Sequence, residues 1–140
     1  MFTSELLIQT FIAGLMIGAL LGYRSPLIER AEQLLNGVHD HLVDKKNVVT
    51  YWTQTGNVPD GDEPDYSTGS GVFWRYVLRV WEAGFLKKPL SDPKFKLILQ
   101  GSADAAVNGS LPSWPDYTPP QWVRDFNDLA VLVAAHRMLK

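Results

Sequence analysis

The feature that most constrains this chain is an apolar segment close to its N-terminus. Residues 6–23 carry no charged side chain, and Gln9 and Thr10 are their clearly polar members. A helix of about 18 residues rises about 1.5 Å per residue and so approaches the thickness of a bilayer's hydrocarbon core. The segment is therefore predicted to be a helix that lies in a membrane or in the core of a helical filament.

Two other interpretations of this segment are a buried helix of a soluble domain and a cleaved secretory signal. A signal is disfavoured because the first five residues contain Glu5 and no Lys or Arg, and no small-x-small cleavage pattern follows. A carboxylate at the edge of an apolar helix is costly unless it is paired or lies among headgroups. Glu5 is therefore expected in the headgroup region or paired with the α-amino group of a neighbouring copy.

Three glycines recur at every fourth residue of this segment. They are Gly14, Gly18 and Gly22. At this spacing they share one helix face, along which another helix can approach closely, although glycine is also simply frequent in membrane helices.

Beyond the apolar segment, the helical pattern continues into a charged region. From Pro26 onward, apolar residues at steps of three and four predict an amphipathic helix that extends to about Trp52. Pro26 removes a backbone donor and is expected to kink the helix or to restart it after Ser25. The chain is thus predicted to comprise a long N-terminal helix, residues 1–52, and a small soluble head, residues 53–140.

The head is predicted to hold short helices and strands separated by turn-rich loops. Ser70 is expected to cap a helix over about 72–86, and residues 95–100 alternate as a strand does. A final helix from about Pro120 has an expected apolar face, which comprises Trp122, Phe126, Leu129 and Val133. The predicted fold class is α+β, a long helix packed on a small domain with short helices and a small antiparallel sheet.

An acidic loop precedes the first helix of the head. Asp60, Asp62 and Asp65 place carboxylates in a short, proline-punctuated window that also holds Glu63. These oxygens could bind calcium, although their spacing lacks the register of a helix–loop–helix site. A solvated acidic loop is the alternative, and no other cofactor is expected.

Composition and motifs argue against catalysis. The net charge is −2 and there is no cysteine, which excludes thiolate nucleophiles and cysteine-based metal sites. His39 and His41 are two residues apart and point to different sides of a helix, and His136 stands alone. With no basic stripe and no nucleotide or protease motif, the chain is predicted to be no enzyme and to bind neither nucleic acid nor a small-molecule substrate.

Two parts of the chain resemble type IV pilins and pseudopilins. The start, Met-Phe-Thr-Ser-Glu-Leu-Leu-Ile, is similar to a mature pilin, in which a glutamate opens the apolar helix and a proline such as Pro26 follows. Further on, Tyr51-Trp52, the loop 56–65, Phe73-Trp74 and Ala83-Gly84-Phe85-Leu86 resemble the aromatic, loop and helix pattern of prepilin-like proteins.

The resemblance implies a structural subunit of a filament built from copies of itself. The assembly residues would be Glu5, Gly14, Gly18, Gly22 and Pro26, with a methylated amine at Met1. The subunit would reside in the inner membrane before assembly and in an extracellular filament afterwards. The alternative is a single-pass accessory subunit of a membrane complex or of a virion membrane. Arg24 and Arg30 follow the apolar segment, which would place its C-terminal domain in the cytoplasm.

Overall fold

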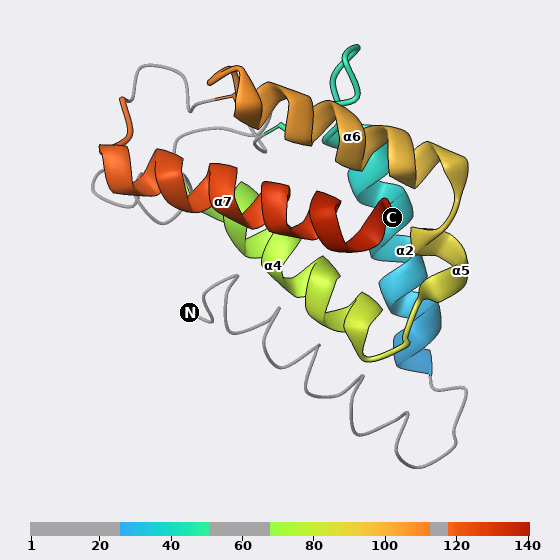
Figure 1. Cartoon of the computed structure of the whole chain (residues 1–140). Helices are drawn as coiled ribbons and strands as arrows, with labels where there is room; N and C mark the ends of the chain where they lie inside the picture. The colour runs from blue at the N-terminus through green and yellow to red at the C-terminus, as the bar shows by residue number, and fades with distance from the viewer. Residues whose placement is uncertain (1–25, 51–67, 113–117) are drawn as a thin grey trace, which may run out of the picture.

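The computed structural model describes residues 26–50, 68–112 and 118–140. These residues form a bundle of α-helices (Figure 1). The helices are α2 (Pro26–His41), α4 (Gly69–Glu82), α5 (Lys87–Leu90), α6 (Pro93–Val107) and α7 (Gln121–Met138). Within the described residues, extended pairing is limited to one isolated antiparallel bridge between Val43 and Val49.

Helix α7 lies between α4 and α6 and packs against both (Figure 1). The backbone N–H of Gly71 bonds to Asn127 near the starts of α4 and α7, and Arg137 bonds to Glu82 near their ends. These two contacts show that α4 and α7 run in the same direction. Helix α6 runs in the opposite direction, and α2 crosses behind this layer (Figure 1).

The core is built where α4, α6 and α7 meet. Its buried apolar side chains include Val49, Trp74, Val77, Leu90, Phe95, Ile98, Leu99, Ala103, Ala106, Val131, Ala134 and Met138. The fully buried ring of Trp74 lies 5.9 Å from that of Phe95, centroid to centroid. Helix α2 joins the core through the half-buried side chains of Leu35 and Val38.

The predicted antiparallel sheet is wrong, because residues 95–100 lie inside α6. The carboxylate of Asp92 accepts a hydrogen bond from the backbone N–H of Lys94 at 2.8 Å, which caps the helix. Proline follows the cap as the first helical residue, where its missing N–H costs nothing. The local alternation of apolar and polar residues is overridden by helical spacing, since Phe95, Ile98 and Leu99 are buried together.

The predicted continuous helix to Trp52 is also wrong, because α2 ends at His41. A tight turn follows, in which the Asp44 carboxylate accepts hydrogen bonds from the N–H groups of Lys46 and Val48, at 2.8 and 2.9 Å. Asn47 adopts the left-handed conformation that such a turn requires, with φ 59°. The part of the predicted long helix that precedes Pro26 lies outside the described residues.

The turn after α2 is held against α6 by two close contacts. The Val49 N–H donates to the buried hydroxyl of Ser102 at 3.1 Å. Gly101 immediately precedes Ser102 in α6. A Cβ atom at Gly101 would lie 2.7 Å from the carbonyl oxygens of Lys46 and Asn47, so only glycine lets the turn approach α6 this closely. The segment therefore packs as a part of the bundle and does not extend α2.

The two helices predicted in the head are present with shifted boundaries. Helix α4 begins at Gly69, earlier than the predicted 72, and Ser70 lies buried inside it while Thr68 occupies the cap position. Helix α7 begins at Gln121, one residue after the predicted Pro120.

Candidate functional site

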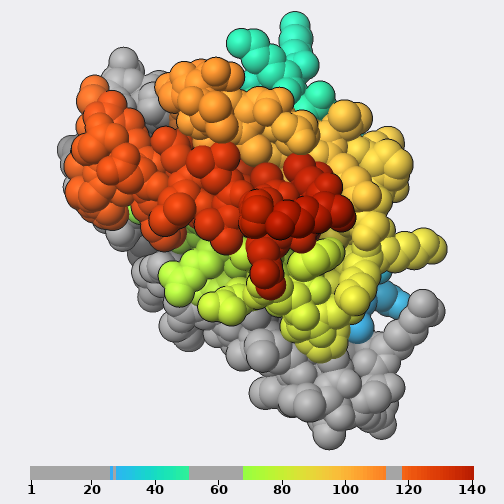
Figure 2. All heavy atoms as spheres, viewed as in Figure 1, coloured from blue at the N-terminus to red at the C-terminus, as the bar shows by residue number. Residues whose placement is uncertain are grey.

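The apolar face predicted for the final helix is turned outward on α7. Trp122, Leu129 and Val133 are 61%, 64% and 43% exposed. The face of α7 that packs into the bundle carries different residues, namely Val123, Asn127, Val131, Ala134 and Met138. Figure 2 shows α7 lying open across one face of the molecule.

We call the exposed apolar row the outer stripe of α7. It consists of Trp122, Phe126, Leu129 and Val133. The steps of four, three and four residues keep these side chains on one helix face, in the pattern of a coiled-coil seam. A row of apolar side chains along one helix face is typical of a surface that binds another molecule. The other large apolar side chains that the described bundle exposes, Leu34, Leu97 and Val107, lie on α2 and α6.

Phe126 connects the outer stripe to α4. Its side chain is half-buried, and its ring lies over Gly71, where a Cβ atom would come within 2.5 Å of Phe126 Cε1. The neighbouring Asn127 points into the bundle, where its Oδ1 accepts a hydrogen bond from the Gly71 N–H at 2.9 Å. These two contacts fix the rotation of α7 about its own axis, and that rotation determines which residues face outward.

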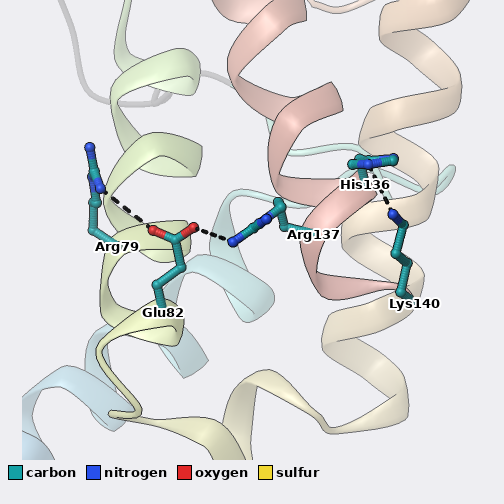
Figure 3. Close-up of polar contacts among 5 residues, drawn as sticks. All are labelled: Arg79, Glu82, His136, Arg137 and Lys140. Atoms are coloured by element: carbon teal, nitrogen blue, oxygen red, sulfur yellow. Dashed lines mark hydrogen bonds and ion pairs between the residues drawn. The ribbon is translucent and has the colours of Figure 1, made fainter.

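A basic edge borders the outer stripe on the α4 side. Glu82 of α4 pairs with Arg79 at 3.5 Å and with Arg137 of α7 at 3.3 Å (Figure 3). Arg75, one helical turn before Arg79, is also exposed on this side of α4. We define Arg75, Arg79 and Arg137 as the basic edge. Exposed ion pairs such as these contribute little to stability, so the edge matters chiefly for its charge.

The opposite border of the stripe carries Asp125. This residue is exposed, and its carboxylate accepts a hydrogen bond from Gln121 Nε2 at 2.7 Å. Partial burial raises the pKa of the nearby Asp128 above its ordinary value, and the charge of Asp125 adds to that effect. The two borders of the outer stripe therefore differ in charge.

The histidines do not form a site. Exposed His136 lies 3.0 Å from Lys140 Nζ, ring Nε2 to amine, near the C-terminal end of α7 (Figure 3). His39 Nδ1 lies 2.6 Å from the Asp40 carboxylate, and this hydrogen bond lowers the pKa of Asp40. Throughout residues 26–50, 68–112 and 118–140, no group of three or more His, Cys, Asp or Glu side chains could hold a metal ion.

Most of the site residues predicted from the sequence lie outside the described residues. They are the assembly residues Glu5, Gly14, Gly18 and Gly22 and the acidic loop residues Asp60, Asp62 and Asp65. Their assigned roles stay predictions. Pro26 is the exposed first residue of α2. Among the helices of the described ranges, none is both long and apolar enough to cross a membrane.

No protein-family model, curated protein or solved structure matches the chain.

Proposed function

We propose that the chain is a non-catalytic, membrane-anchored subunit that assembles through the outer stripe of α7. The observation that carries this proposal is the exposure of Trp122, Leu129 and Val133 on one helix face. Burial of three such side chains against a partner would contribute roughly 25 cal/mol for each Å² of apolar surface removed from water.

The anchor is residues 6–23. Its support is the uncharged sequence, which is about as long as a bilayer-spanning helix requires. Two residues separate Tyr23 from Pro26, where α2 begins. At no more than about 3.6 Å per residue, that connection keeps the start of the bundle close to the headgroups. The bundle would then lie at the membrane surface, where its partners are concentrated.

A pilus-like filament subunit is the second candidate. It is favoured by Glu5 at the start of the apolar segment, a position suited to pairing with a neighbour's α-amino group. The predicted head had an α+β fold with an antiparallel sheet, whereas the described part of the head is helical. Membrane-complex assembly therefore takes precedence. Glu5→Ala should leave the membrane subunit intact, and loss of filaments in that variant would favour the second candidate.

Alkaline carbonate extraction of membranes from cells that express the full chain tests the anchor. The wild-type chain is expected to stay in the membrane pellet. A variant with Leu15→Lys and Ile17→Lys places two charges in the apolar segment and should be released, because each central charge costs about 3 kcal/mol. A matched variant with Lys45→Ala and Lys46→Ala, in the turn after α2, should stay in the pellet. Release of the wild-type chain would contradict the proposal.

A further inference from the structure

We propose that the occupant of the outer stripe is the same stripe of a second copy of this chain. The two α7 helices would run in parallel about a two-fold axis that lies along them. This inference rests on the proposed function, since it names the partner of the assembly surface. It draws on two observations, the spacing of the stripe and the charges along its borders, and it is consistent with the proposed anchor.

The spacing matches a two-stranded coiled coil. In a heptad labelled a to g, Trp122 and Leu129 fall at d positions and Phe126 and Val133 at a positions. Residues at a and d pack between the residues of the facing helix, so a second α7 would cover the exposed row along its length. A row of four such side chains over about three helical turns is a short seam, which a shared membrane anchor would help to stabilise by raising the local concentration.

The charges along the borders favour a parallel pair. Asp125 precedes Phe126 and so occupies a g position, whereas Arg137 falls at an e position. In a parallel coiled coil, a g residue meets the e position five residues further along the partner, which is residue 130 for Asp125. The contacts of Gly71 with Asn127 and of Glu82 with Arg137 join residues 56 and 55 apart. Arg75 therefore lies level with about residue 130 and faces Asp125 of the second copy.

An antiparallel pair would be opposed by the same charges. In that arrangement e positions meet e positions, so the basic edges of the two copies would face each other. Arg75, Arg79 and Arg137 carry three positive charges, of which Glu82 balances one. The parallel arrangement separates these edges and places each beside Asp125 of the other copy.

The anchor is compatible with the parallel pair. A two-fold axis along α7 places the starts of both α2 helices, at Pro26, at the same level along that axis, so both proposed anchors could enter one bilayer. Within that segment, Gly14, Gly18 and Gly22 recur at the spacing that allows close helix pairing in membranes.

Cysteine cross-linking of the full chain tests the pairing, because the natural chain contains no cysteine. Leu129→Cys places one thiol at a d position of the stripe, and Leu97→Cys places one on α6 at similar exposure, 58% against 64%. Each variant is reconstituted in lipid vesicles at a low ratio of protein to lipid and oxidised mildly. Parallel d positions bring the two Cα atoms within disulfide range, about 4.4–6.8 Å. The Leu129→Cys variant should therefore cross-link to itself at least tenfold faster than Leu97→Cys.

Charge exchange tests the direction of the pair in the Leu129→Cys background. Asp125→Arg and Arg75→Asp should each lower the cross-linking rate roughly two- to fivefold, the range expected for an exposed charge pair. The two substitutions together should restore the rate, because they exchange the partners of the pair. Failure of the double variant to recover would overturn the parallel arrangement.

Other occupants predict different results. If the stripe docked on the bilayer, brominated lipids would quench Trp122 fluorescence. Leu129→Cys would then cross-link no faster than Leu97→Cys, and that result would overturn the pairing. If the stripe bound a different protein, purified vesicles would again show equal rates. Carbonate extraction is performed on the same vesicles. Retention in the lipid fraction together with equal rates would overturn the pairing alone, whereas release would overturn the proposed anchor.

Discussion

The side chain of Asn127, buried near the start of α7, accepts a hydrogen bond from the backbone N–H of Gly71 in the first turn of α4. The first N–H groups of any helix lack partners within it, and the residue at the cap position, Thr68, forms no side-chain cap. Helix α4 is therefore capped from a neighbouring helix. The same contact turns Asn127 inward and leaves the outer stripe exposed.

Removal of this cap should destabilise the bundle. In Asn127→Ala the buried Gly71 N–H loses its acceptor, which is expected to lower the free energy of unfolding by about 1–3 kcal/mol. Urea denaturation followed by tryptophan fluorescence measures the change. Asn108→Ala is the matched control, because Asn108 is exposed at the end of α6, and it should stay within about 0.5 kcal/mol of wild type. Equal losses in both variants would show that the contact does not cap α4.

Phe126 packs so closely on α4 that even an added methyl group at Gly71 should destabilise the fold. In Gly71→Ala the new methyl group would lie 2.5 Å from the Phe126 ring and 2.7 Å from Asn127 Oδ1, which must shift apart. The expected loss in the free energy of unfolding is about 1–3 kcal/mol. Gly69→Ala, two residues earlier with no atom within 4 Å, should instead raise stability by about 0.4–1 kcal/mol. A stable Gly71→Ala protein would contradict this packing.

The contact between α6 and the turn after α2 predicts a second sensitive glycine. A methyl group at Gly101 would lie 2.7 Å from two backbone carbonyl oxygens, those of Lys46 and Asn47, which cannot rotate away as a side chain can. Gly101→Ala should therefore lower the thermal midpoint and increase hydrogen exchange at the Val49 N–H, which bonds to Ser102. Gly37→Ala in α2, where no atom lies within 4 Å, should do neither. Unchanged exchange at Val49 in Gly101→Ala would show that the turn does not pack on α6.

Asp128 predicts a pH dependence of stability. Its pKa is raised above 3.8 by partial burial and by Asp125, so folding favours the protonated carboxyl. The stability that the protonated Asp128 carboxyl contributes is complete below its ordinary pKa. That stability is lost as pH rises through the raised pKa. Asp128→Asn should match wild type at low pH and become more stable above this window, by no more than about 0.5 kcal/mol at neutral pH.

Asp40 provides the opposite case. The hydrogen bond with His39 lowers the pKa of Asp40, so the ionised carboxylate stabilises the folded state. This stabilisation is present above pH 3.8 and is lost as pH falls through the lowered pKa. Asp40→Asn should therefore be less stable than wild type near neutrality. Urea denaturation at several pH values compares the two variants. If the free energies of unfolding of wild type and Asp128→Asn changed with pH in the same way, that result would contradict the raised pKa of Asp128.

Helix positions were predictable where strong periodicity coincided with a start signal. The final helix begins within one residue of its predicted start at Pro120. Helix α6 was missed because residues 95–100 alternate in polarity over a short window. The Asp92-Pro93 pair, an N-cap followed by proline, was the signal that identifies it.

The exposed face of α7 could not be predicted from periodicity alone. Two apolar rows run along this helix, and only the row with the larger side chains, led by Trp122, was predicted as its apolar face. Smaller residues such as Ala134 occupy the buried face because α7 lies between two helices and must approach both. Tertiary packing thus determined which row is exposed, and with it the candidate site. The roles predicted for Glu5 and for the acidic loop stay predictions.

The most direct test of assembly through α7 is the native mass of the complex extracted from membranes in mild detergent. Leu129→Glu with Val133→Glu places two charges on the outer stripe, whereas the control, Leu97→Glu with Val107→Glu, charges exposed apolar positions of α6. Wild type and the control should share one mass above that of a single chain. The stripe variant should have a lower mass while it keeps its helical circular dichroism. An unchanged mass in the stripe variant would contradict assembly through α7.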